Sequence, residues 1–187
     1  MPVNCITTIT KSHKPASSGE AGTRRQKMFD KFGEFDSWEE LNKAAEGQKE
    51  EGDLEALKAL AIENGFEAAD AEDYMDGAVP EFCNALLAAN CKIRLEEEDL
   101  KPEGIMVDWF DYIYQLISED EKFRLAVRKK GKRVKECFGR HLKWGYKNKK
   151  PVDEEIKKAA GFSGNVQFGM PGILEARKII KSYYLEG

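Results

Sequence analysis

At 187 residues, with 41% hydrophobic and 34% charged residues, the chain fits a soluble globular protein of one domain, or one and a half, that is long enough to bury a core. No apolar run approaches the roughly 20 residues of a membrane-spanning helix, which argues against a membrane partner. The first residues also lack the apolar stretch of a secretory signal, so we expect a cytoplasmic protein.

The formal net charge of −4 conceals four blocks of different charge. Residues 1–29 hold five basic residues and one acidic residue, whereas residues 30–121 hold seven basic and 27 acidic residues. Residues 122–150 hold thirteen basic residues and one acid, Glu136, and residues 151–187 hold five of each kind. The chain is therefore strongly dipolar.

Residues 1–27 are predicted to form a disordered N-terminal arm, because they are polar and show neither helical nor strand periodicity. A helical domain over residues 28–187 is expected to follow. It has an acidic part (30–121), a basic part (122–150) and a C-terminal helical part (151–187).

Helix signals begin soon after the arm. Ser37 and Glu40 form a capping box before a helix that is expected to reach about residue 50. Asp53 caps a second helix, which ends at Gly65. A short helix is expected at about 69–75, and a longer one from about 80 to 94.

Residues 54–77 outline a helix–turn–helix-like corner. In a DNA-reading corner the second helix carries basic or amide side chains into the major groove. Here that helix is acidic, so the corner is either purely structural or a surface for a basic groove of a protein partner. The candidate partner residues are Asp70, Glu72, Asp73 and Asp76. The acidic run at 96–99 either extends this face or is a solvated helix end.

A helix beginning near residue 105 is apolar on more than one side, which predicts a central place in the core or in a partner interface. Its apolar residues follow helical spacing: Ile105, Trp109, Ile113 and Leu116 on one face, Phe110 and Tyr114 on another. Ser118 and Glu121 form a second capping box, and the helix after it is expected to end at Gly131.

The next helix is amphipathic, with the apolar positions Val134, Cys137, Phe138, His141 and Leu142. His141 is interpreted as a core histidine rather than a base. A short helix starts at Asp153 and ends at Gly161, and Pro171 fits the first turn of a last helix. Only residues 165–168 resemble a strand. The predicted fold is all-α, a compact multi-helix domain with at most one short strand or hairpin.

The basic block exceeds what helix ends require. Dipole complementation accounts for three of its bases, at 128–130, but not for those along the next helix. Uncompensated positive charge points to a negative partner: a phosphate backbone, duplex DNA above all, or the acidic block of the same chain or of a second copy in a homodimer. A merely solvated face is the third alternative. The candidate nucleic-acid-binding residues are Arg128, Lys129, Lys130, Lys132, Arg133, Lys135, Arg140, Lys143, Trp144 and Lys147.

Catalytic and metal-binding patterns are not found. There is no nucleophile elbow, Walker loop, zinc-protease motif or dinucleotide fingerprint. The cysteines at 5, 83, 91 and 137 are scattered and lack zinc spacing, so we expect buried free thiols. We expect no enzyme, no cofactor and no metal.

Several segments are similar to small proteins from mobile elements of gut Firmicutes. They include "KFGEFDSWEELNKAAEGQKEEGDLEALKALAIENG", "DAEDYMDGAVPE", "DLKPEGIMVDW", "AVRKKGK", "LKWGYKNKKPVDEEIKKAAG" and "GMPGILEARKIIKSYYLEG". The chain from about Met28 to Gly187 resembles type II-A anti-CRISPR proteins, which inhibit the RNA-guided type II CRISPR nuclease. The likeness runs along the chain and includes no diagnostic active-site motif.

The resemblance implies a non-enzymatic inhibitor in a bacterial host cell. Such a protein binds the guide-loaded nuclease, blocks cleavage of target DNA and has a further affinity for DNA itself. An acidic surface suits the positive channel of such a nuclease, and a basic surface suits nucleic acid. The alternative is a DNA-binding accessory or regulatory protein of a mobile genetic element without a nuclease partner.

Overall fold

The computed structural model describes residues 29–186, and in this range the all-α prediction is confirmed. The predicted arm, residues 1–27, lies outside the described residues. None of the helices in the described range is long and apolar enough to cross a membrane. The elements are α1 (Trp38–Glu51), α2 (Leu54–Glu63), α3 (Ala68–Met75), α4 (Ala85–Leu100), α5 (Ile105–Glu119), α6 (Glu121–Arg128), α7 (Val134–Asn148), β1 (Lys150–Pro151), α8 (Glu154–Ala159), β2 (Gln167–Phe168) and α9 (Ile173–Leu185).

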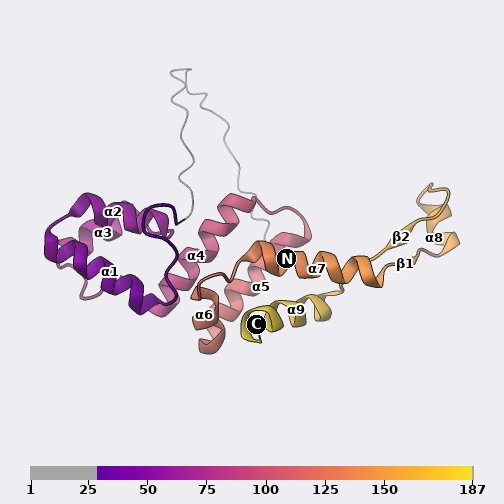
Figure 1. Cartoon of the computed structure of the whole chain (residues 1–187). Coiled ribbons are helices and arrows are strands. Elements are labelled where there is room, and N and C mark those ends of the chain that lie inside the picture. The colour runs from indigo at the N-terminus through magenta and orange to yellow at the C-terminus, as the bar shows by residue number, and fades with distance from the viewer. Residues whose placement is uncertain (1–28, 187) are drawn as a thin grey trace, which may run out of the picture.

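Two hydrophobic cores lie side by side along an elongated molecule (Figure 1). The first is enclosed by α1, α2, α3 and the first turns of α4. The second is enclosed by the rest of α4 with α5, α6, α7 and α9. Helix α4 serves both, because Ala88 and Cys91 face the first core whereas Ala89 and Ile93 face the second. One helix with two apolar sides thus joins the halves.

Side-chain caps set the first residues of several helices. Ser37 Oγ accepts the Glu40 amide at 3.2 Å, and Asp53 accepts the Ala56 amide at 2.9 Å. The reciprocal bond of the first capping box differs from the prediction, since the Glu40 carboxylate accepts the amide of Asp36. Helix α4 begins five residues later than expected, because Asn84 accepts the Leu87 amide and thereby caps it.

The predicted capping box at Ser118 and Glu121 is wrong. Helix α5 continues to Glu119, and Asp120 caps α6 by accepting the amide of Phe123 at 3.1 Å. Ser118 instead donates to the carbonyl of Tyr114, one turn back in α5. Pro171 precedes α9 rather than forming its first turn, because the helix begins at Ile173 with Gly172 as the capping residue.

The helix–turn–helix-like corner is formed by α2 and α3, which pack against each other. Gly65 ends α2 with φ +85°, a conformation that side chains other than glycine rarely adopt. A Cβ added at Gly65 would lie 2.3 Å from the carbonyl oxygen of Cys91. The corner therefore sits directly on the backbone of α4, which fixes the orientation of α3.

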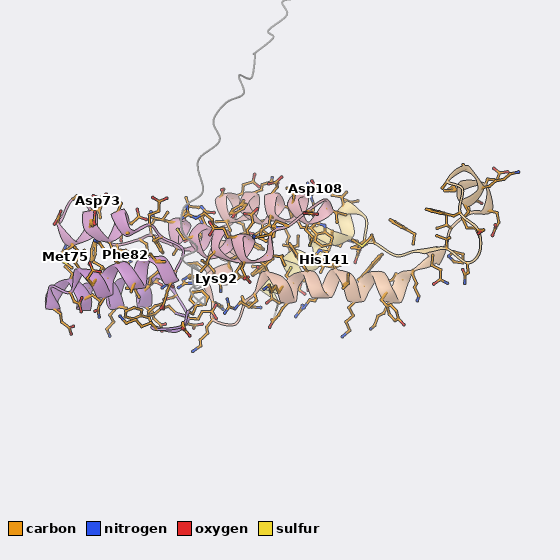
Figure 2. All side chains as sticks on the ribbon, turned by 90° about the horizontal axis from the view of Figure 1, so that it is seen from above. Asp73, Met75, Phe82, Lys92, Asp108 and His141 are labelled. Carbon is orange, nitrogen blue, oxygen red and sulfur yellow. The ribbon has the colours of Figure 1, made fainter. Side chains whose placement is uncertain are left out.

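An ionic cluster lies where the two cores meet, around Lys92 at the middle of the molecule in Figure 2. The Lys92 ammonium is 2.7 Å from a carboxylate oxygen of Glu34, and it also donates to the carbonyl of Lys129 at 2.9 Å. Glu96 of α4 accepts the amide of Val134, at the start of α7, at 2.5 Å. The acidic run at 96–99 therefore begins inside the protein and not on the predicted acidic face.

The segment 29–36 crosses this junction and connects three parts of the fold. The amides of Lys31 and Phe32 donate to the carboxylate of Glu63 on α2. Glu34 and Asp36 accept the amides of Gly131 and Lys130, which lie between α6 and α7. This segment therefore fastens the first core to the second.

Beyond α7 the chain leaves the body of the molecule, and residues 149–169 form a projection made of β1, α8 and β2 (Figure 1). We name this projection the arm; it is distinct from the predicted N-terminal arm. The strands pair antiparallel, with Lys150 opposite Phe168 and Pro151 opposite Gln167. The predicted strand at 165–168 is thus confirmed in a shorter form. Its partner β1, which includes a proline, was not expected. Helix α8 begins at the predicted cap, Asp153, and Gly161 follows its end with φ +73°.

Candidate nucleic-acid interface

The thirteen basic residues of 122–150 do not form one surface. Arg128 is 2% exposed, and its Nη2 donates to the side-chain oxygen of Asn64 at 2.7 Å. Its guanidinium faces the ring of Phe29 at 5.9 Å. Arg128 was predicted to bind nucleic acid, but a side chain buried to this extent has no access to a phosphate. Arg128 is buried because α6 turns its last residue inward, between the two cores.

Three further candidates make contacts within their own chain, two of them with acidic residues. Lys135 pairs with Asp99 of α4 at 2.5 Å. The Arg133 guanidinium lies 3.7 Å from Glu96 and 3.8 Å from Glu34. Lys132 donates to the Tyr183 carbonyl at 2.7 Å. The alternative in which the acidic block compensates the basic block within one chain therefore holds for this end of α7.

Burial affects Lys132 further. It lowers the pKa of this ammonium, and the nearby charges of Arg140 and Lys129 act in the same direction. Lys129 and Lys130 themselves are exposed in the connection between α6 and α7, and their backbone groups bond to Lys92 and Asp36. The connection is thus fixed by its backbone, and the two ammonium groups extend into solvent.

The rest of α7 carries uncompensated positive charge. Its buried stripe, Val134, Cys137, Phe138, His141 and Gly145, packs on the second core and turns the opposite stripe outward. Along that outer stripe and just after it lie five exposed basic residues that form no ion pair with any described residue. We name this set the basic face; it consists of Arg140, Lys143, Lys147, Lys149 and Lys150.

Two side chains of the basic face contact aromatic rings. The Arg140 guanidinium lies 4.8 Å from the ring centre of Tyr183, and the Lys149 ammonium lies 4.3 Å from that of Tyr146. Both distances are within the range of cation–π attraction. Trp144, a candidate aromatic residue of this surface, is half-buried. Tyr146, two residues later on α7, is 73% exposed.

His141 lies on the inner side of α7 (Figure 2) and is fully buried. Its ring stacks on Trp109 with 4.1 Å between centres. The Nδ1 is 3.0 Å from the Cys137 carbonyl and the Nε2 is 3.1 Å from the Ala176 carbonyl. Burial lowers the pKa of the ring, more than these two carbonyls raise it. The residue is a core histidine that connects α7 to α9, as its spacing predicted.

The acidic candidates lie at the opposite end of the molecule from the basic face (Figures 1 and 2). We name Asp70, Glu72, Asp73 and Asp76 the acidic end. Asp70 accepts the amide of Glu67 at 2.8 Å and thus belongs to the cap of α3. Glu72 pairs with Lys58 of α2 at 2.7 Å. Asp73 and Asp76 are exposed and form no ion pair among the described residues.

A shallow groove of about 270 Å³ adjoins the acidic end. It lies between α3 and the connection to α4, and both Asp70 and Asp73 line it. Its apolar wall includes Val79 and Leu87, which are 37% and 41% exposed. An acidic rim beside an aliphatic wall suits a lysine or arginine side chain of a partner, since such side chains have an apolar stem and a charged tip.

No group of three or more histidine, cysteine or acidic side chains suited to hold a metal ion occurs among residues 29–186. Cys83, Cys91 and Cys137 are buried free thiols, as predicted. Burial raises their pKa values, to about 12, 11 and 12 respectively. Such thiols remain protonated at neutral pH and are poor nucleophiles.

No protein-family model, curated protein or solved structure matches the chain.

Proposed function

We propose that the protein is a binding protein whose basic face contacts nucleic-acid phosphates and whose acidic end contacts a basic protein surface. The observation that carries this proposal is the set of five exposed basic residues on and just after α7, the basic face, which form no ion pair with any residue in the described range 29–186. The chain has 34 acidic residues, and one of them in that range, Asp99, pairs with Lys135, whereas none in that range pairs with the basic face. Clustered positive charge on a folded protein favours a polyanionic partner.

Inhibition of an RNA-guided type II nuclease is the activity that best joins the two surfaces. The guide-loaded enzyme combines a positively charged channel with bound nucleic acid, so both ends of this molecule have a complement there. The grooved acidic end supports this candidate, as does the likeness to type II-A anti-CRISPR proteins. The runner-up, a DNA-binding accessory protein of a mobile element, needs the basic face alone.

Three parallel measurements test the proposal. The purified chain is mixed with a nuclease–guide complex, with bare duplex DNA and with buffer, and each mixture is passed over a sizing column. A matched cleavage assay uses the same nuclease. Co-elution with the complex and loss of cleavage support the inhibitor, whereas co-elution with DNA alone supports the accessory protein. Elution as a dimer that binds neither contradicts both and favours self-association.

A further inference from the structure

The junction between α7 and the arm exposes large aromatic rings. Within residues 29–186 the most exposed aromatic side chains are Tyr146, Phe168 and Phe162, at 73%, 67% and 63%. Tyr146 is in the last turns of α7, and Phe168 is in β2. Exposed rings of this size contribute little to folding, since their apolar surface remains in water.

Close backbone contact brings together the chain segments that carry two of these rings. A Cβ at Gly145 would lie 1.8 Å from the carbonyl oxygen of Gly169, and a Cβ at Gly169 would lie 2.2 Å from that of Gly145. The two backbones therefore touch, and only glycine at both positions allows it. Tyr146 and Phe168 are the sequence neighbours of this pair. The contact fixes the base of the arm on α7 and places both rings at the junction.

Lysines surround the two rings. Lys143 is one helical turn before Tyr146, and the Lys149 ammonium is 4.3 Å from the centre of its ring. Lys150 is the cross-strand partner of Phe168, so both side chains lie on the same face of the ribbon. No acidic residue occurs between Glu136 and Asp153. The junction thus combines exposed rings with lysines that form no ion pair with any described residue.

We infer that this junction binds unpaired nucleotides, with the lysines on phosphates and with Tyr146 and Phe168 stacked on bases. The inference rests on the proposed nucleic-acid contact of the basic face and specifies the form of nucleic acid. Single strands offer free base faces for stacking, whereas the bases of a duplex are already stacked on each other. An apolar protein patch would cover the rings but would also have to desolvate the surrounding ammonium groups, which is costly.

The experiment measures binding of the full chain to two labelled probes, an oligothymidylate of about 20 nucleotides and a duplex of the same length. The principal variant is Tyr146→Ala with Phe168→Ala, which removes both rings and keeps every lysine. Its matched control is Ile156→Ala with Phe162→Ala. Those side chains are 62% and 63% exposed and lie outside the lysine cluster, in and just after α8. Tyr146→Phe with Phe168→Tyr is the conservative variant.

We expect the principal variant to bind the single strand more weakly, by on the order of tenfold for each ring, and the duplex within about twofold of the unchanged chain. The control and conservative variants should bind both probes normally. Circular dichroism checks that each variant folds. We expect that all of them do, because the substituted side chains are exposed and do not pack in a core.

The remaining outcomes separate this inference from the proposal beneath it. If the unchanged chain binds neither probe, nucleic-acid contact by the basic face is itself wrong. If it binds both probes and loss of the rings weakens neither, or weakens both alike, phosphate binding stands and base stacking is refuted. If loss of the rings abolishes only co-elution with a nuclease or with a second copy, the junction is a protein contact and the inference is refuted.

Discussion

Lys92 and Glu34 form an ion pair of 2.7 Å between a side chain that is fully buried and one that is 8% exposed. Burial lowers the pKa of Lys92, and the hydrogen bond and charge of Glu34 offset part of that effect. Burial also opposes ionisation of Glu34, but the hydrogen bond and charge of Lys92, the amide of Gly131 and the charge of Arg133 together outweigh it and lower its pKa. Each member of the pair therefore offsets part of the cost of burying the other.

Removal of one partner should unfold the protein more easily. We expect Glu34→Ala to lower the free energy of unfolding by about 3–5 kcal/mol, because it leaves a buried ammonium with only a carbonyl partner. Urea denaturation followed by circular dichroism measures this. Glu34→Gln with Lys92→Met removes both charges and should recover much of the loss. Equal stability of the single and double variants would contradict the pairing.

The N-terminal boundary gives a second prediction. A chain that begins at Met28 should fold and bind like the full chain, because it keeps the contacts that fasten segment 29–36 to Glu63 and to the connection between α6 and α7. A chain that begins at Ser37 is the matched control. It should melt well below the first because it lacks Glu34, together with its ion pair to Lys92 and its hydrogen bond from Gly131. A large loss of melting temperature on removal of residues 1–27 alone would refute the prediction that these residues are dispensable.

Binding through phosphates predicts a defined salt response. If about four phosphates are neutralised, the logarithm of the association constant should fall against that of salt concentration with a slope near −3 to −4. Lys143→Ala with Lys147→Ala should reduce this slope and weaken binding to every sequence alike. Lys135→Ala is the control on the same helix, since its ammonium already pairs with Asp99. Strong sequence preference would instead indicate contacts to base edges.

The acidic end gives the fourth prediction. Asp73→Lys with Asp76→Lys should slow association with a nuclease–guide complex more than it speeds dissociation, because exposed charges mainly steer encounter. Asp70 is left unchanged, since it belongs to the cap of α3. Asp108→Lys with Asp111→Lys, on exposed positions of α5, makes the same change of charge elsewhere. Unchanged association kinetics in the first variant, or equal slowing in both, would remove the acidic end as the partner surface.

His141 predicts the direction of one pH effect. Its pKa is lower in the folded chain than its ordinary value of 6.5, so the unfolded state binds the proton more readily. Its contribution to stability is therefore present above pH 6.5 and declines as pH falls below it. Glu96, whose pKa is raised by burial, contributes the opposite trend. Comparing the unchanged chain with His141→Gln at each pH cancels that trend. A difference in stability that does not change with pH would refute the assignment.

Most helices could be predicted from the sequence because their signals are local. The caps at Ser37, Asp53 and Asp153 and the stops at Gly65 and Gly161 depend on residues within one turn, and they hold in the structure. Exposure was harder to predict. Leu142 continues the apolar spacing of α7 yet is 70% exposed, and Arg128 belongs to a basic run yet is buried. Both outcomes depend on which distant helix packs beside them.

In the candidate site, too, local features could be predicted from the sequence and contacts with distant elements could not. The outward direction of Lys143 and Lys147 follows from the apolar stripe of α7, which the sequence displays. The partners of Arg133 and Lys135 come from segment 29–36 and from α4, and spacing along the chain does not reveal them. The glycines at 145 and 169 could have indicated the junction, but only their contact in space shows that they act together.

The three buried thiols divide between the two cores, and this gives each half its own chemical reporter. Cys83 and Cys91 belong to the first core and Cys137 to the second. Alkylation requires a thiolate in contact with solvent, so each sulfur reacts only when its half opens. Peptide-resolved labelling rates under native conditions would thus report whether the halves open as one cooperative unit or separately, without any introduced cysteine.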